Sequence, residues 1–253
     1  MAESVVIVGI GEMGGVFAHG LLRCGRTVHP VTRATDPLAV AREVPEPEVV
    51  LVAVAEADLH PVLDRVPQAW QDRLALLQNE LLPDDWKRHD LPAPTVAVVW
   101  FEKKKGQPTR VVLPTRLAGP HAPILIDALE ALDIPARPVE GELLHEMVTK
   151  NLYILTTNIA GLEVGGTVSE LWSRHRDLAS DVVTEVVALQ AWRAGVTLPQ
   201  HELIERMVAA FDGDPDHRCT GRSAPTRLAR ALDQAREAGL QLPTLERIAA
   251  RHL

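Results

Sequence analysis

The stretch "VVIVGIGEMGGVFAHGLLRCGRTVHPVTR", residues 5–33, decides the fold of this chain. It opens with the β-branched run Val5–Val8, which is typical of a buried strand, and residues 14–23 continue with the apolar spacing of a helix. A second short strand is expected over residues 27–31. Strand, helix and strand at this rhythm predict a parallel sheet with helices on both faces.

Three glycines lie where the first strand passes into the helix. Gly9, Gly11 and Gly14 form the pattern Gly-x-Gly-x-x-Gly. The first glycine permits a tight turn, the second lets the backbone approach a pyrophosphate, and the third lets the helix pack closely on the strand. The helix N-terminus, at Glu12 and Met13, presents unpaired amides to the phosphates. The pattern therefore predicts a dinucleotide-binding site.

The end of the second strand bears on which dinucleotide binds. An NAD-specific site presents Asp or Glu to the ribose hydroxyls, but this strand ends in Thr32 and Arg33. An arginine can pair with a 2′-phosphate through its planar fork, so we predict NADP, bound as NADPH for reduction. Asp36 is close enough to keep NAD as the less favoured alternative. The plain structural alternative is a solvated arginine on a surface loop.

The remainder of the chain shows two patterns of predicted secondary structure. In the first part we expect further strands and helices over residues 49–54 (strand), 59–70 (helix), 74–77 (strand), 95–101 with 110–113 (an antiparallel pair), 122–132 (helix) and 136–139 (strand). From Gly141 the pattern is helical, over residues 143–163, 167–194, 199–211 and 223–238. We predict an α/β fold followed by an all-α fold, with a Rossmann-like doubly wound domain at 1–140. The helical domain at 141–253 is expected to contact substrate and is the candidate for a homodimer contact.

Three side chains are candidates for chemistry. Asn79 follows the fourth strand, at the sheet edge where ligands bind, and its carboxamide can donate to a substrate or nicotinamide oxygen. A turn or helix-capping role is the alternative for this residue. Lys150 and Asn158 are eight residues apart, so they share one face of a helix. A partly buried lysine has a lowered pKa and can protonate a carbonyl oxygen as hydride arrives, while Asn158 orients the substrate. The alternative is a lysine at the helix rim with its ammonium in water.

Four segments together resemble the 2-dehydropantoate 2-reductase (ketopantoate reductase) family, in their order and approximate spacing: "IVGIGEMGGVFAHGLLRCGRTVHPVTR", "LLQNE", "KNLYILTTNIAGL" and "LARALDQAREAGLQLPTLERI". The resemblance covers nearly the whole chain. It implies an NADP-binding Rossmann domain joined to a helical domain, with reduction of a 2-oxo acid in the cleft between them. It also implies that Lys150 is the general acid, Asn158 a substrate ligand, Asn79 a neighbour of the nicotinamide and Arg33 the 2′-phosphate ligand.

The chain departs from the family pattern at four positions. Ala55, Glu80, Ile154 and Ser223 stand where the family has a lysine, a glycine, an asparagine and an acidic residue. A site built to hydrogen-bond one substrate leaves buried groups unpaired with another, so these changes argue against ketopantoate itself. A related 2-oxo acid, a bulkier ketone or an imine is favoured. Arg222 or Arg218 could hold a carboxylate, and a surface salt bridge is the alternative for both.

We therefore predict an NADP-dependent oxidoreductase acting on CH–OH or CH–NH groups. The alternatives are a β-hydroxyacid dehydrogenase or imine reductase of the same two-domain plan, and an inactive NADP-binding sensor or partner protein. The net charge of -8 argues against binding to nucleic acid or to an anionic membrane. No export signal or metal-ligand spacing is recognisable, so we expect a metal-free cytoplasmic protein with a small-molecule substrate.

Overall fold

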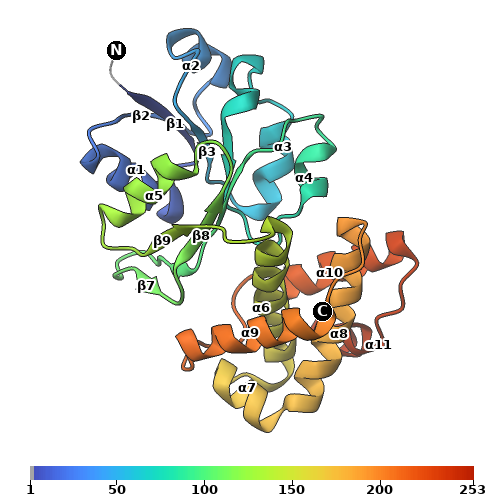
Figure 1. Ribbon diagram of the computed structural model, residues 1–253. Coiled ribbons are helices and arrows are strands. Elements are labelled where there is room, and N and C mark those ends of the chain that lie inside the picture. The colour runs from blue at the N-terminus through green and yellow to red at the C-terminus, as the bar shows by residue number, and fades with distance from the viewer. Residues whose placement is uncertain (1–2) are drawn as a thin grey trace. The chain divides into compact units, whose positions relative to one another are not determined.

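The computed structural model describes residues 3–253, and the chain divides into two compact units (Figure 1). The first unit ends at Glu146 and the second is Met147–Leu253. The division falls inside a helix, slightly later than the boundary near residue 140 that the sequence predicts. The first unit is of the α/β class, and the named elements of the second are all helices.

The first unit is built on a seven-stranded sheet with the order β2-β1-β3-β4-β5-β8-β9. Its strands are β1 (Ser4–Val8), β2 (Thr27–Val31), β3 (Val50–Val52), β4 (Leu74–Leu76), β5 (Thr95–Val98), β8 (Thr115–Ala118) and β9 (Ala136–Pro138). All neighbours pair in parallel except β5 with β8. The predicted doubly wound sheet is confirmed. Because β2, β1, β3 and β4 are parallel neighbours, their carboxyl ends meet at one edge.

Helices and short connections cover this sheet. They are α1 (Glu12–Arg23), α2 (Pro37–Glu43), α3 (Leu59–Leu63), α4 (Pro83–Lys87), α5 (Ala122–Glu130) and the 3-10 turns η1 (Glu56–Asp58) and η2 (Gln68–Arg73). The prediction of one helix over residues 59–70 is wrong. The helix stops at Leu63 and a 3-10 turn begins after Pro67, because proline has no amide hydrogen to continue a helix.

The predicted antiparallel pair exists as a separate hairpin of β6 (Phe101–Glu102) and β7 (Arg110–Val111). The earlier part of the same predicted segment, β5, belongs to the main sheet instead.

The core of the first unit follows the two-residue period of its strands. Val5 and Ile7 of β1 belong to a cluster with α1 and α5, while Val6 between them is also fully buried on the opposite face. Helices α1 and α5 lie side by side (Figure 1). They approach closely at Gly20, where an added Cβ would lie 1.9 Å from the backbone oxygen of Ala128.

The second unit contains most of α6 (Leu143–Val164), together with α7 (Val168–Arg174), α8 (Arg176–Ala194), α9 (Gln200–Gly213), α10 (Ala224–Ala238) and α11 (Pro243–His252). The single helix expected over residues 167–194 is divided at His175 into α7 and α8. The Glu185 carboxylate of α8 accepts hydrogen bonds from the amides of Thr244 and Leu245 at 2.8 and 3.0 Å. An acidic side chain thereby neutralises the positive end of α11 and fixes it to α8. Among the described residues, none of the helices has the length and apolar character that crossing a bilayer requires.

Candidate functional site

The glycine-rich turn has the geometry of a backbone cradle. Gly9 has a φ of 93°, in the region that favours glycine, and its Cβ would lie 2.9 Å from the oxygen of Ala53. A Cβ on Gly14 would lie 2.0 Å from the oxygen of Gly9, so the helix can start this close to the strand only without a side chain. Gly11 is the N-cap of α1, and a Cβ there would meet open space. The amides from Glu12 onward therefore begin α1 next to glycine backbone that carries no side chains. This arrangement suits the binding of an anionic pyrophosphate.

Arg33 lies just beyond the carboxyl end of β2, and its side chain is 94% exposed. Its guanidinium pairs with the carboxylate of Asp58 at 3.1 Å, and Asp58 comes from η1, which follows β3. Thr32 is held by Thr35, since the two hydroxyl oxygens lie 2.9 Å apart. An incoming 2′-phosphate would therefore compete with the Asp58 carboxylate for Arg33.

Asp36, whose position keeps NAD as an alternative, has a structural role. Its carboxylate accepts a hydrogen bond from the Leu38 amide at 3.0 Å and caps the N-terminus of α2.

The segment after β4 carries Asn79 to the same edge of the sheet. Gln78 anchors this segment by donating from Nε2 to the Val52 oxygen at 2.8 Å. Asn79 Nδ2 donates to the Glu56 carboxylate at 3.1 Å. Glu80 has a φ of 63°, so the position where the family has glycine keeps a glycine-like backbone despite its side chain. The edge therefore brings together the glycine-rich turn, Arg33 and Asn79.

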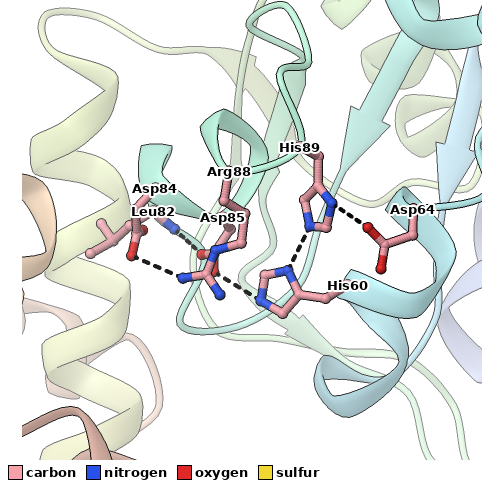
Figure 2. Close-up of polar contacts among 7 residues, drawn as sticks. All are labelled: His60, Asp64, Leu82, Asp84, Asp85, Arg88 and His89. Carbon is pink, nitrogen blue, oxygen red and sulfur yellow. Dashed lines mark hydrogen bonds and ion pairs between the residues drawn. The ribbon is translucent and has the colours of Figure 1, made fainter. Parts of the chain in front are cut away.

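A polar network fastens the segment after β4 to α3 (Figure 2). His89 Nδ1 lies 2.9 Å from the Asp64 carboxylate, and His89 Nε2 lies 3.0 Å from His60 Nδ1. Because a carboxylate only accepts, neutral His89 donates at Nδ1 and accepts the Nδ1 hydrogen of His60 at Nε2. Neutral His60 then turns an unprotonated Nε2 toward Asp85 Oδ1 at 3.5 Å. Asp85 is itself buried and accepts from the Leu82 amide at 2.8 Å.

We expect this network to make stability depend on pH. Burial lowers the pKa of His60 from its usual 6.5; the Asp85 carboxylate opposes this effect, and Arg88 and His89 reinforce it. The unfolded chain therefore binds a proton at a higher pH than the folded protein does. The contribution is fully present above the unfolded pKa and is lost as the pH falls through the folded pKa.

Urea unfolding between about pH 7.5 and about pH 5.5 measures this effect, as the pH range brackets the ordinary titration of histidine. The variant His60→Leu should lose less stability over that range than the unmodified protein. His201→Leu, at an exposed position of α9, is the control and should keep the original slope. Equal slopes in all three proteins would contradict the expectation.

In the second unit, α6 is buried along most of its length but has one more accessible stripe. Asn151 donates from Nδ2 to Gln190 of α8 at 2.8 Å, and the Tyr153 ring packs on Phe211. The partly exposed positions recur every four residues at Lys150, Ile154, Asn158 and Leu162. Lys150 Nζ lies 5.5 Å from the centre of the Tyr153 ring. The helix thus presents Lys150 and Asn158 on one face, with an apolar side chain between them.

The segment before α10 packs on α6 next to this face, at Thr157 and Gly161. The Thr220 amide donates to the Thr157 oxygen at 3.2 Å, and Gly161 permits the contact because a Cβ there would lie 2.5 Å from the Thr220 nitrogen. Arg222 and Ser223, the predicted substrate residues of this segment, are both exposed. Ser223 is the N-cap residue of α10 and forms no side-chain capping hydrogen bond.

Sequence reasoning missed Arg227. This residue is only 8% exposed, and its Nη1 donates to Asn158 Oδ1 at 3.0 Å. Its position one helical turn after Ser223 was the available signal, because residues four apart lie on one face of a helix.

The chain has the two-part fold of ketopantoate reductases, which confirms the predicted resemblance at the level of the fold. A PanE/ApbA family ketopantoate reductase from Ralstonia eutropha JMP134 is 18% identical, with a TM-score of 0.68 over 98% of this chain and 96% of that one.

Two further solved structures show the same similarity. A dimeric ketopantoate reductase from Staphylococcus aureus is 20% identical, with a TM-score of 0.64 and coverage of 98% of this chain and 96% of that one. D-Mandelate dehydrogenase with NADH and anilino(oxo)acetate is 13% identical, with a TM-score of 0.67 and the same coverage values. No protein-family model and no curated protein matches the sequence. Within residues 3–253, histidine, cysteine and acidic side chains form no group suited to a metal ion.

Proposed function

We propose that the protein is an NADPH-dependent reductase that transfers hydride to the carbonyl carbon of a 2-oxo acid or a related ketone. The observation that carries this proposal is the accessible stripe of α6, where a lysine and an amide lie on one face of an otherwise buried helix. The similarity to reductases and dehydrogenases of the same fold supports it. The departures at Ala55, Glu80, Ile154 and Ser223 lead us to propose a substrate other than ketopantoate.

The residues of the first unit suit a dinucleotide. Gly9, Gly11 and Gly14 keep side chains out of the turn, and the start of α1 offers amides to a pyrophosphate. Asn79 would donate to the carboxamide of the nicotinamide in place of its present bond to Glu56. The nicotinamide, when bound, supplies the hydride.

The residues of the second unit would act on the substrate oxygen. Lys150 would donate its ammonium proton to the oxygen as the carbon receives hydride, so that an alcohol forms rather than an alkoxide. Asn158 would hold the substrate by hydrogen bonds, and Ile154 would present an apolar surface between these two groups. A panel of 2-oxo acids, ketones and cyclic imines, followed by NADPH oxidation, tests the proposal. Turnover of imines alone would favour an imine reductase.

Cofactor preference is expected to depend on Arg33. The variant Arg33→Gln should weaken NADPH binding about 10- to 100-fold, because a charge-assisted bond to the 2′-phosphate is lost, and should change NADH binding little. Asp58→Asn should strengthen NADPH binding, since it removes the anion that now pairs with Arg33. Cofactor fluorescence titrations measure both.

Arg42→Gln is the matched control, because Arg42 is an exposed arginine on α2 that lies 3.9 Å from the Asp36 carboxylate. Equal losses of NADPH and NADH affinity in Arg33→Gln would overturn the assignment of NADP and leave NAD, the cofactor of the mandelate dehydrogenase structure, as the better choice.

A further inference from the structure

A buried cation contacts the accessible stripe of α6. Arg227, on α10, is 8% exposed, and its guanidinium donates to Asn158 Oδ1 at 3.0 Å. The two residues are 69 positions apart in the chain. Burying a guanidinium is costly unless its hydrogen bonds are made, and the bond to Asn158 is one of those that hold Arg227 in place.

The chemistry of the pair fixes which way the amide faces. A guanidinium has only donors, so the atom of Asn158 that faces Arg227 must be the carbonyl oxygen. The NH₂ group is the other branch of the planar amide and is directed away from Arg227. The backbone at Gly221 lies near the same oxygen, since a Cβ on Gly221 would lie 3.9 Å from Asn158 Oδ1. Rotation that exchanged the two branches would set an amide donor against the guanidinium donors.

We propose that Arg227 is a positioning residue that holds Asn158 as a hydrogen-bond donor toward the substrate. The inference rests on the proposed function for the role of Asn158. It adds that this residue recognises an oxygen acceptor, a carbonyl or carboxylate, and does not accept from a hydroxyl or N–H group of the substrate. The positive charge of Arg227 polarises the amide and strengthens its donor character toward an anionic oxygen.

A double-mutant cycle on the substrate constants tests this role. Arg227→Gln should raise KM about 10- to 100-fold, as expected for loss of an oriented bond to a charged group, with a much smaller change in kcat. Asn158→Ala should give a similar rise. Because Arg227 acts through Asn158, the double variant should be no worse than Asn158→Ala alone. Arg227→Lys keeps a donor and should recover part of the loss.

Arg236→Gln is the control for loss of an arginine from α10, because Arg236 is exposed and pairs with Asp233. It should leave KM unchanged. Independent effects of the two site variants, which multiply in the double variant, would overturn the proposal. A loss in Arg227→Gln that follows only its thermal stability, with KM unchanged in the folded fraction, would overturn it equally.

A second measurement needs no turnover. The side-chain NH₂ resonances of Asn158, identified by their absence in Asn158→Ala, should move in Arg227→Gln and stay in place in Arg236→Gln. Unmoved resonances would refute the Arg227 role even in an active enzyme. Moved resonances in a protein that reduces no carbonyl would uphold the orientation of the amide and refute the proposed function instead.

Discussion

Lys150→Met is expected to reduce NADPH-dependent turnover by about 10²- to 10⁴-fold, the range that a positioned proton donor contributes. Methionine keeps a long flexible chain but has no proton to give to the substrate oxygen. Cofactor binding should be unchanged, because the glycine-rich turn and Arg33 are on the first unit. Rates of NADPH oxidation measured at saturating NADPH report on turnover, and a cofactor titration reports on binding. Together they separate the chemical step from binding.

Lys105→Met is the matched control. Lys105 is exposed in the turn of the β6–β7 hairpin, so its replacement should leave turnover as it is. If the unmodified protein binds NADPH without turning over any member of the substrate panel, and Lys150→Met changes only stability, the protein is an NADP sensor rather than a reductase. The four departures from the family pattern would then mark lost activity rather than a changed substrate.

Two glycines of α1 are expected to respond to alanine in opposite directions. At Gly20 a Cβ would lie 1.9 Å from the Ala128 oxygen, so α1 and α5 must separate, and we expect Gly20→Ala to cost about 2–3 kcal/mol of unfolding free energy. At Gly15 a Cβ meets nothing within 4 Å. Gly15→Ala should therefore stabilise the protein by about 0.5–1 kcal/mol, since glycine is a poor residue for a helix interior.

Urea unfolding of the two variants beside the unmodified protein measures both changes. The pair is informative because the substitution, the helix and the secondary-structure propensity are the same, and only the surroundings differ. Loss of stability at both positions would show that Gly15 has a neighbour, and gain at both would show that α1 and α5 can separate without cost.

Glu80 illustrates how a family position can change in sequence while its backbone is kept. A left-handed conformation costs a residue with a side chain about 1–2 kcal/mol relative to glycine. Glu80 adopts this conformation, with a φ of 63°, and the residue is buried, with only 8% of its surface exposed. The backbone of the turn after Asn79 therefore has the conformation that a glycine would allow. Glutamate in place of glycine changes the side chain at this turn more than it changes the backbone.

Features that depend on spacing along one element were predictable from the residues alone. The Gly-x-Gly-x-x-Gly pattern predicted the turn between β1 and α1, and the eight-residue separation of Lys150 and Asn158 predicted their common face on α6. The order of strands and helices also predicted the two-part fold. Each of these follows from a local period, of two residues in a strand or 3.6 in a helix, that the sequence states directly.

Pairings between distant elements could not be read in this way. Arg33 meets Asp58, and Arg227 meets Asn158, only because packing brings together elements 25 and 69 residues apart. Asp36 looked available to a ribose but caps α2. A side chain's partner depends on which elements the core places beside it, and no local period encodes that choice. The amino-acid sequence thus specified the glycine-rich turn and the common face of Lys150 and Asn158, whereas only the tertiary structure placed Arg227 of α10 beside Asn158.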